Sequence, residues 1–259
     1  MSFRKWVEDT EALFRLMPAN SPIKHRLEEL IINARDFALI GHTLDMVKID
    51  LPEIEVPGKT FFVLERPLEF SHIGETVKHV TPLRREHLPT CLFLPQYDPN
   101  TPILNGMILA HSLVHVEQTF RPDDRLLNNQ EFAGRGEQEA WGLNYDMLKA
   151  VDGEALDRYF KSINHDINYV PSGTGYSVEI NVSFDHQGLI PPPEGSLLRQ
   201  LWDEGETAKR IVVSMSLYAA AVEAGKELPS GNERVGYLAI GLMLNPQQPE
   251  TDQSIPFMQ

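Results

Sequence analysis

Two histidines, His111 and His115, lie four residues apart in a segment whose pattern predicts a helix. Because an α-helix completes a turn every 3.6 residues, both imidazoles project from the same face, one turn apart. Imidazoles at this spacing can bind one metal ion together, and zinc is the ion that most often uses such a pair. The pair therefore predicts a metal site, and two hydrogen-bonded core histidines are the structural alternative.

The helix that carries the pair, residues 103–120, is apolar on nearly all sides. Met107 and Gln118 share the histidine face, whereas Leu109 and Leu113 lie on the opposite side. A helix of this composition is expected to be buried. Its imidazoles then need partners, because an unpaired buried polar group destabilises a protein by about 1–3 kcal/mol.

A second predicted helix, over residues 131–151, offers the third protein ligand that a zinc site requires. Its apolar face includes Ala140 and Leu143. Glu137 lies nearer the centre of this face than Glu139 does. Glu137 is therefore the predicted carboxylate ligand, with Glu139 as the alternate.

The run His111-Ser112-Leu113-Val114-His115, followed by Glu137-Gln138-Glu139-Ala140, resembles the gluzincin type of zinc metallopeptidase. Those enzymes carry H-E-x-x-H on a core helix and a glutamate ligand on the next helix, in several families within E-x-x-A. The resemblance covers about residues 90–150 and implies zinc bound by His111, His115 and Glu137. It also implies a zincin-like core, with a small sheet packed on the metal-site helix pair, and a peptide or protein as partner.

Ser112 stands where these enzymes have their glutamate base. A serine cannot accept a proton from zinc-bound water as a carboxylate does. Glu117 lies well away from the histidine face, and Trp141 occupies the place of a family aspartate, so Glu139 is the one speculative catalytic group. A hydrolase and a non-catalytic binding or scaffold domain both stay open as functions.

A three-histidine site is a further alternative. His42, near the predicted end of the second helix, could join His111 and His115 as in DinB-type bundles, which pair a lone histidine with a later H-x-x-x-H. The simpler interpretation of His42 is a histidine favoured by the dipole at the C-terminal end of a helix.

The composition narrows the classes of partner. Lys and Arg total 23 and Asp and Glu total 37, which gives a net charge of −14. Such a surface repels nucleic acid and anionic membranes, so neither is an expected partner. The lone Cys91 excludes an internal disulfide, and no apolar signal core opens the chain, so we expect a cytoplasmic location. The oligomeric state is not predicted.

The hydrophobic periodicity predicts an α+β fold. The expected helices are 3–17, 22 to about 41, 102–120, 131–151, 153–163 and 196–225, and the expected strands flank Pro57-Gly58 and cover 91–94 and 176–184. Residues 235–244 could be a strand or a buried helix. His165 and Asp166 are interpreted as polar residues of a loop. Residues 1–190 are expected to form the metal-binding domain, 191–245 a C-terminal helical portion, and 246–259 a flexible tail.

Overall fold

The computed structural model describes residues 3–40, 61–66, 75–78, 90–120, 130–172, 175–184 and 191–223. Helices account for most of these residues. The helices are α1 (Phe3–Leu16), α2 (Pro22–Phe37), α4 (Pro102–Thr119), α6 (Gln130–Asp152), α7 (Glu154–Lys161), α8 (Leu197–Asp203) and α9 (Glu206–Glu223). The strands are β1 (Ala38–Ile40), β2 (Phe61–Arg66), β3 (Glu75–Lys78), β4 (Thr90–Pro95), β5 (Ile163–Ser172) and β6 (Gly175–Phe184).

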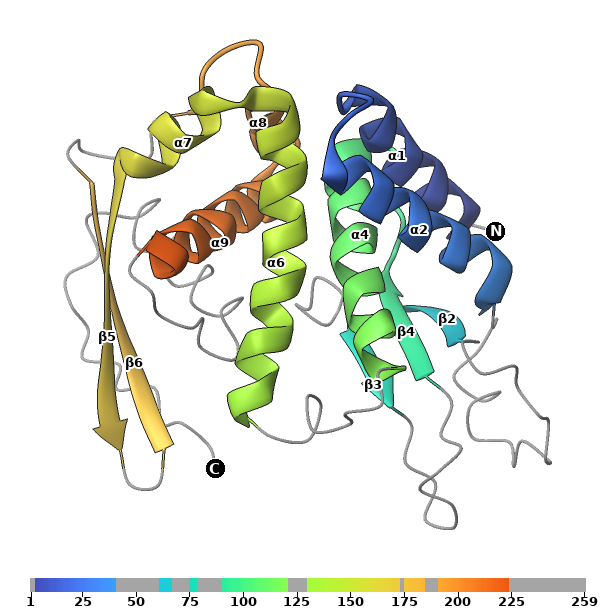
Figure 1. Ribbon diagram of the computed structural model, residues 1–259, viewed down its shortest axis with the longest axis horizontal. Coiled ribbons are helices and arrows are strands. Elements are labelled where there is room, and N and C mark those ends of the chain that lie inside the picture. Colours follow the sequence, from blue (N-terminus) through green and yellow to red (C-terminus); the bar gives the residue numbers. More distant parts are fainter. Residues whose placement is uncertain are drawn as a thin grey trace.

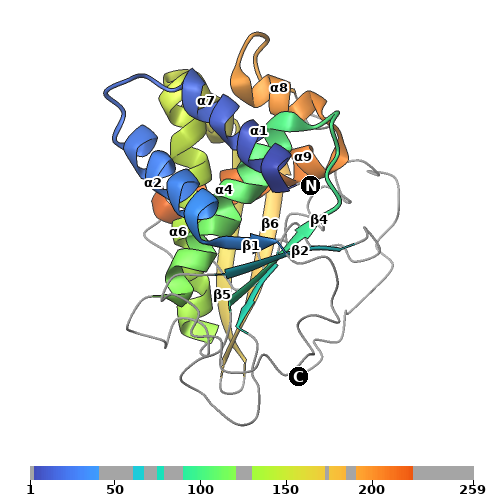
Figure 2. The ribbon, with the colours of Figure 1, turned by 90° about the vertical axis from the view of Figure 1, so that its right-hand side faces the viewer.

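Helix α6 runs through the middle of the molecule (Figure 1). On one side of it lie α1, α2 and α4, with the sheet of β2, β3 and β4 beside the lower half of α4. On the other side lie α7, α8, α9 and the long hairpin of β5 and β6. The view turned by 90° shows α2 and α6 on one side of α4, with β2 and β4 beneath the helices (Figure 2).

The larger sheet has the strand order β1-β2-β4-β3. β1, β2 and β4 are parallel to one another, and β3 pairs antiparallel to β4. Phe61 and Val63 in β2, and Leu92 and Leu94 in β4, are buried. Because alternate residues of a strand face the same side, these four side chains form one apolar face that packs toward the helices.

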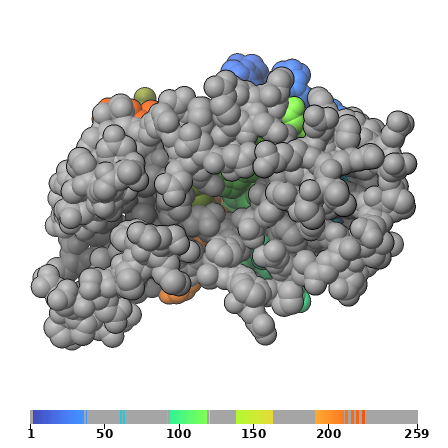
Figure 3. All heavy atoms as spheres, turned by 90° about the horizontal axis from the view of Figure 1, so that it is seen from below, coloured from blue at the N-terminus to red at the C-terminus, as the bar shows by residue number. Residues whose placement is uncertain are grey.

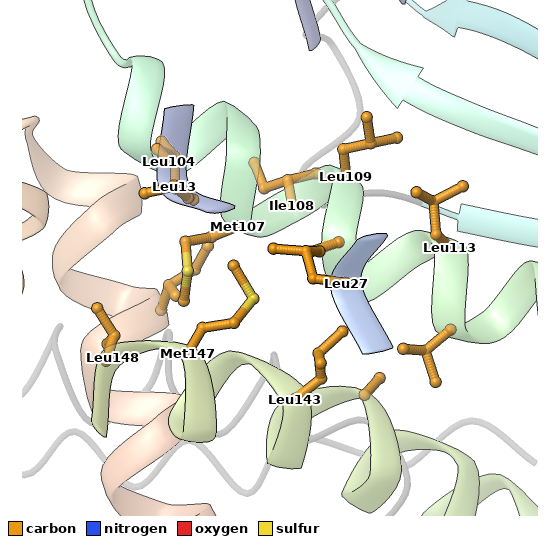
Figure 4. Close-up of a cluster of buried hydrophobic side chains, with 14 of the residues drawn as sticks. Leu13, Leu27, Leu104, Met107, Ile108, Leu109, Leu113, Leu143, Met147 and Leu148 are labelled. Carbon is orange, nitrogen blue, oxygen red and sulfur yellow. The ribbon is translucent and has the colours of Figure 1, made fainter. Parts of the chain in front are cut away.

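The core between the helices is built from aliphatic side chains and methionine. Met107 and Ile108 of α4 meet Leu143 and Met147 of α6, and Leu27 of α2 closes the same cluster (Figure 4). All five side chains are buried. Helix α4 is thus covered by α1, α2 and α6, which confirms the predicted buried histidine helix.

Three elements differ from the sequence-based expectation. The second helix ends at Phe37, because Ala38 begins β1 and pairs with Phe61 of β2. The single helix expected over 196–225 is divided into α8 and α9 at Gly205, whose φ of 117° no helix can contain. His165 belongs to β5 rather than to a loop, since it pairs with Val182 of β6.

A zincin-like core, the finer part of the fold expectation, is not supported by the described residues. Helices supply most of their core, and the strands of the larger sheet are only three to six residues long. The expectations for residues 235–244, for the tail 246–259 and for the first strand before Pro57 lie outside the described residues. None of the described helices combines the length and apolar composition needed to cross a lipid bilayer.

Candidate metal centre

Helix α4 begins at Pro102, a position where the missing N–H of proline is tolerated. Thr101 precedes it without forming a side-chain cap. The carboxylate of Glu204 instead accepts hydrogen bonds from the backbone N–H groups of Ile103 (2.9 Å) and Leu104 (2.6 Å). A negative group at this end also interacts favourably with the helix dipole. Burial raises the pKa of Glu204, and the two N–H donors act against that rise.

Helix α1 packs tightly against α4 at Gly106. A Cβ atom at this position would lie 2.7 Å from Leu13 Cδ1 and 3.1 Å from the backbone oxygen of Asp9. The Thr10 hydroxyl donates to the Trp6 carbonyl at 2.8 Å and lies 3.4 Å from the Gly106 carbonyl. The missing side chain at 106 therefore sets the position of α4 against α1.

The two histidines lie in the C-terminal half of α4. The Nε2 atoms of His111 and His115 are 3.1 Å apart. Their rings meet edge to face, with centroids 4.8 Å apart and an interplanar angle of 74°. His111 is buried and His115 is half-buried. The helical spacing predicted this meeting, and the structure places both Nε2 atoms toward one point.

Gln118 determines which nitrogen of His115 carries the proton. His115 Nδ1 lies 2.9 Å from Gln118 Oε1, and Gln118 Nε2 donates to Glu139 Oε2 at 3.0 Å. An ionised carboxylate only accepts hydrogen bonds, so the amide nitrogen of Gln118 must face Glu139 and its oxygen must face His115. His115 Nδ1 is therefore the donor to Gln118 Oε1, and its Nε2 atom faces His111 Nε2 at 3.1 Å.

Arg26 of α2 joins the C-terminal end of α4 to the N-terminal half of α6. Its Nη1 atom donates to Glu117 Oε1 at 2.9 Å, its Nη2 atom also pairs with that carboxylate, and Nη2 lies 3.8 Å from Glu139 Oε1. The three side chains are about one-third exposed. Glu117 is thus engaged away from the histidines, as its helical position predicted. Glu139 reaches the histidines through Gln118, and a catalytic role for it stays a prediction.

Trp141 packs against His111, and Ser112 is buried beside it in α4. Trp141 is buried, and its ring centroid lies 4.5 Å from that of His111 at an angle of 59°. Ser112, the residue in place of a glutamate base, is only 2% exposed. Position 112 therefore supplies a hydroxyl and no carboxylate that could accept a proton beside the histidines.

Glu137 and His42 are the other two residues that the sequence offers as metal ligands in these sites. Glu137 lies in α6, one helical turn before Trp141, and its side chain is outside the described ones. His42 lies outside the described residues. Within the described part of the chain, no group of three His, Cys, Asp or Glu side chains could hold a metal ion. The structure therefore brings together two of the three predicted ligands, and the third stays a prediction.

The histidine pair fits the donor set of a zinc ion. With tetrahedral geometry and zinc–nitrogen bonds of about 2.0–2.1 Å, two ligand nitrogens lie about 3.3 Å apart. The Nε2 atoms, at 3.1 Å, need to separate only slightly. Without an ion, the same separation suits a hydrogen bond donated by His111 Nε2 to His115 Nε2. Zinc binding through Nε2 requires His115 to hold its remaining proton on Nδ1.

Figure 3 views the molecule from the end at which α4 finishes and α6 begins, and some green and olive atoms of the described helices are visible there. Comparison of this chain with protein-family models, curated proteins and solved structures finds no match. No family is shown. The function is therefore inferred from the residues and their geometry.

A second polar cluster lies at the other end of α6, where it meets α7. Tyr145 Oη donates to Asp157 Oδ1 at 2.5 Å, and Lys149 Nζ lies 3.1 Å from Asp157 Oδ2. Burial and the bond to Asp157 raise the pKa of Tyr145 to about 12. The same bond, with help from Lys149, lowers the pKa of Asp157. At neutral pH this phenol is protonated, so the cluster joins two helices and supplies no nucleophile.

Proposed function

We propose that this chain is a zinc-binding protein in which His111 and His115 bind the ion through Nε2 and Glu137 is the third ligand. The observation that carries the proposal is the 3.1 Å separation of the two Nε2 atoms inside a buried helix packed by α2 and α6. The donor set follows from the resemblance to gluzincin metallopeptidases, and the helix register supports it. Glu137 lies one turn N-terminal of Trp141, and α6 runs antiparallel to α4 (Figure 1).

The contact between Trp141 of α6 and His111 of α4, whose ring centroids lie 4.5 Å apart, indicates this register. In antiparallel helices, moving one turn toward the N-terminus of α6 corresponds to moving one turn toward the C-terminus of α4. Glu137, one turn before Trp141, therefore falls at the level of His115.

A zinc ion held by three protein ligands supplies Lewis acidity and lowers the pKa of a bound water. Hydrolysis needs in addition a base to take the proton of that water, and the buried Ser112 cannot do so. A non-catalytic zinc domain, which binds a peptide or protein rather than cutting it, is therefore the second candidate function. Ser112 is the observation that favours it.

Metal content after zinc loading and dialysis tests the proposal. We expect about one zinc ion per chain in the parent and none in the double variant His111→Ala, His115→Ala, by mass spectrometry of the purified proteins. His25→Ala is the matched control, because His25 is exposed on α2 and pairs with Glu29 instead. Circular dichroism verifies that each variant retains its helices. A parent without zinc would overturn the proposal.

A further inference from the structure

We propose that Gln118 is a positioning residue. It holds His115 in the tautomer whose Nε2 lone pair is available to bind the metal ion. The proposal deepens the zinc function above and rests on it. Gln118 is only 2% exposed, and both ends of its amide are engaged, Oε1 with His115 Nδ1 and Nε2 with Glu139. Ligating histidines characteristically donate their second ring N–H to such a partner, which fixes the tautomer and the ring orientation.

The orientation of Gln118 is itself determined by charge. A primary amide could present either its oxygen or its NH2 group to His115, and the wrong choice would leave His115 Nδ1 as an acceptor. Glu139 removes that freedom, because its carboxylate accepts from the NH2 group. Arg26 Nη2 lies 3.8 Å from the other Glu139 oxygen, so the chain of contacts extends to α2. The relay therefore runs from Arg26 through Glu139 and Gln118 to His115.

This relay differs in kind from the carboxylate that commonly supports a ligating histidine. The acceptor of the His115 proton is the neutral amide of Gln118. The carboxylate, Glu139 of α6, contacts that amide and not the histidine. The relay also connects three helices, since Arg26 lies on α2, Gln118 on α4 and Glu139 on α6. A change at Glu139 is thus expected to reach the metal site without touching a ligand.

Zinc affinity measured against a competing chelator tests the role of Gln118. Gln118→Leu removes the acceptor and is expected to weaken zinc binding by about 10- to 100-fold, the usual effect of losing such a partner. The double variant Gln118→Glu, Glu139→Gln exchanges acid and amide, so that the carboxylate introduced at position 118 can accept from both His115 and the new amide at position 139. We expect this double variant to bind zinc with an affinity within a few-fold of that of the parent. Gln200→Leu, the same change on an exposed turn of α8, is expected to have no effect.

A second readout is independent of zinc and of the folding of any variant. The 15N chemical shifts of the His115 ring in the zinc-free parent are expected to show protonated Nδ1 and unprotonated Nε2. The opposite tautomer would overturn the role of Gln118.

The outcomes separate the two proposals. A parent that binds no zinc defeats the zinc function, and the positioning role with it. A folded Gln118→Leu variant that binds zinc as tightly as the parent defeats the positioning role alone. Weakened binding in Gln118→Leu together with recovery in the exchanged pair supports both.

Discussion

Gly106→Ala tests how closely α1 and α4 must approach to place the histidine helix. The new Cβ would lie 2.7 Å from Leu13 Cδ1, which can move, and 3.1 Å from the backbone oxygen of Asp9, which is held in α1. Overpacking of this kind destabilises by about 1–3 kcal/mol. Replacing glycine by alanine inside a helix returns about 0.8–1.0 kcal/mol. The expected net loss in free energy of unfolding is therefore about 1 kcal/mol, with about 2 kcal/mol as the upper limit.

Gly142→Ala is the matched control on α6. Its Cβ would lie 2.8 Å from the Tyr218 hydroxyl, the far end of a half-buried side chain that can swing aside. The gain in helix propensity then offsets most of the displacement, and we expect a change near zero. Urea unfolding followed by circular dichroism measures both variants, with the midpoint shifting at constant slope. If Gly106→Ala is as stable as the parent, or Gly142→Ala is the weaker of the two, the packing argument is refuted.

Three further predictions concern the base, the helix start and the second cluster. Zinc-loaded Ser112→Glu is expected to cleave a fluorogenic peptide, whereas the parent and Ser112→Gln do not, because only the carboxylate can accept the proton; cleavage by the glutamine variant would contradict this. Glu204→Gln is expected to lower the free energy of unfolding in urea by about 0.5–2 kcal/mol, because α4 loses a charged acceptor at its first N–H groups; an unchanged midpoint would count against that role. The phenol of Tyr145 is expected to ionise near pH 12 by ultraviolet absorbance, and Asp157→Asn is expected to lower this pKa. Since the folded pKa of Tyr145 exceeds its unfolded value of about 10, the stabilisation is complete below pH 10 and is lost as the pH rises toward 12. The lowered pKa of Asp157 acts in the opposite range, with stabilisation present above about pH 4 and lost on acidification, so Tyr145→Phe is expected to flatten the acid limb of the stability profile.

The elements that the sequence predicted well are those governed by short-range periodicity. The helix at 3–16 and the strand at 175–184 follow from apolar spacings of 3.6 and 2 residues, which local backbone geometry imposes. The errors lie where distant contacts decide. Phe37 ends α2 because the next residue pairs with Phe61, and β5 forms because β6 is available as its partner. The break between α8 and α9 is the exception, because Gly205 is a local signal for it.

The candidate site divides along the same line. Helical spacing alone predicted that His111 and His115 share one face, and that Gln118 lies on that face with them. It could not predict the donors and acceptors that surround them. Arg26 and Glu139 come from two other helices, so their bonds appear only once those helices pack.

The sequence by itself therefore determined that the two histidines share one face of their helix, because an α-helix repeats every 3.6 residues whatever surrounds it. It also determined that their helix is buried, since an all-round apolar helix is stable only inside a core. Tertiary structure alone decided which nitrogen of His115 carries the proton. That choice depends on the amide of Gln118, which is oriented by the carboxylate of Glu139 on another helix. The two residues are 21 positions apart in the sequence and meet only when the helices pack.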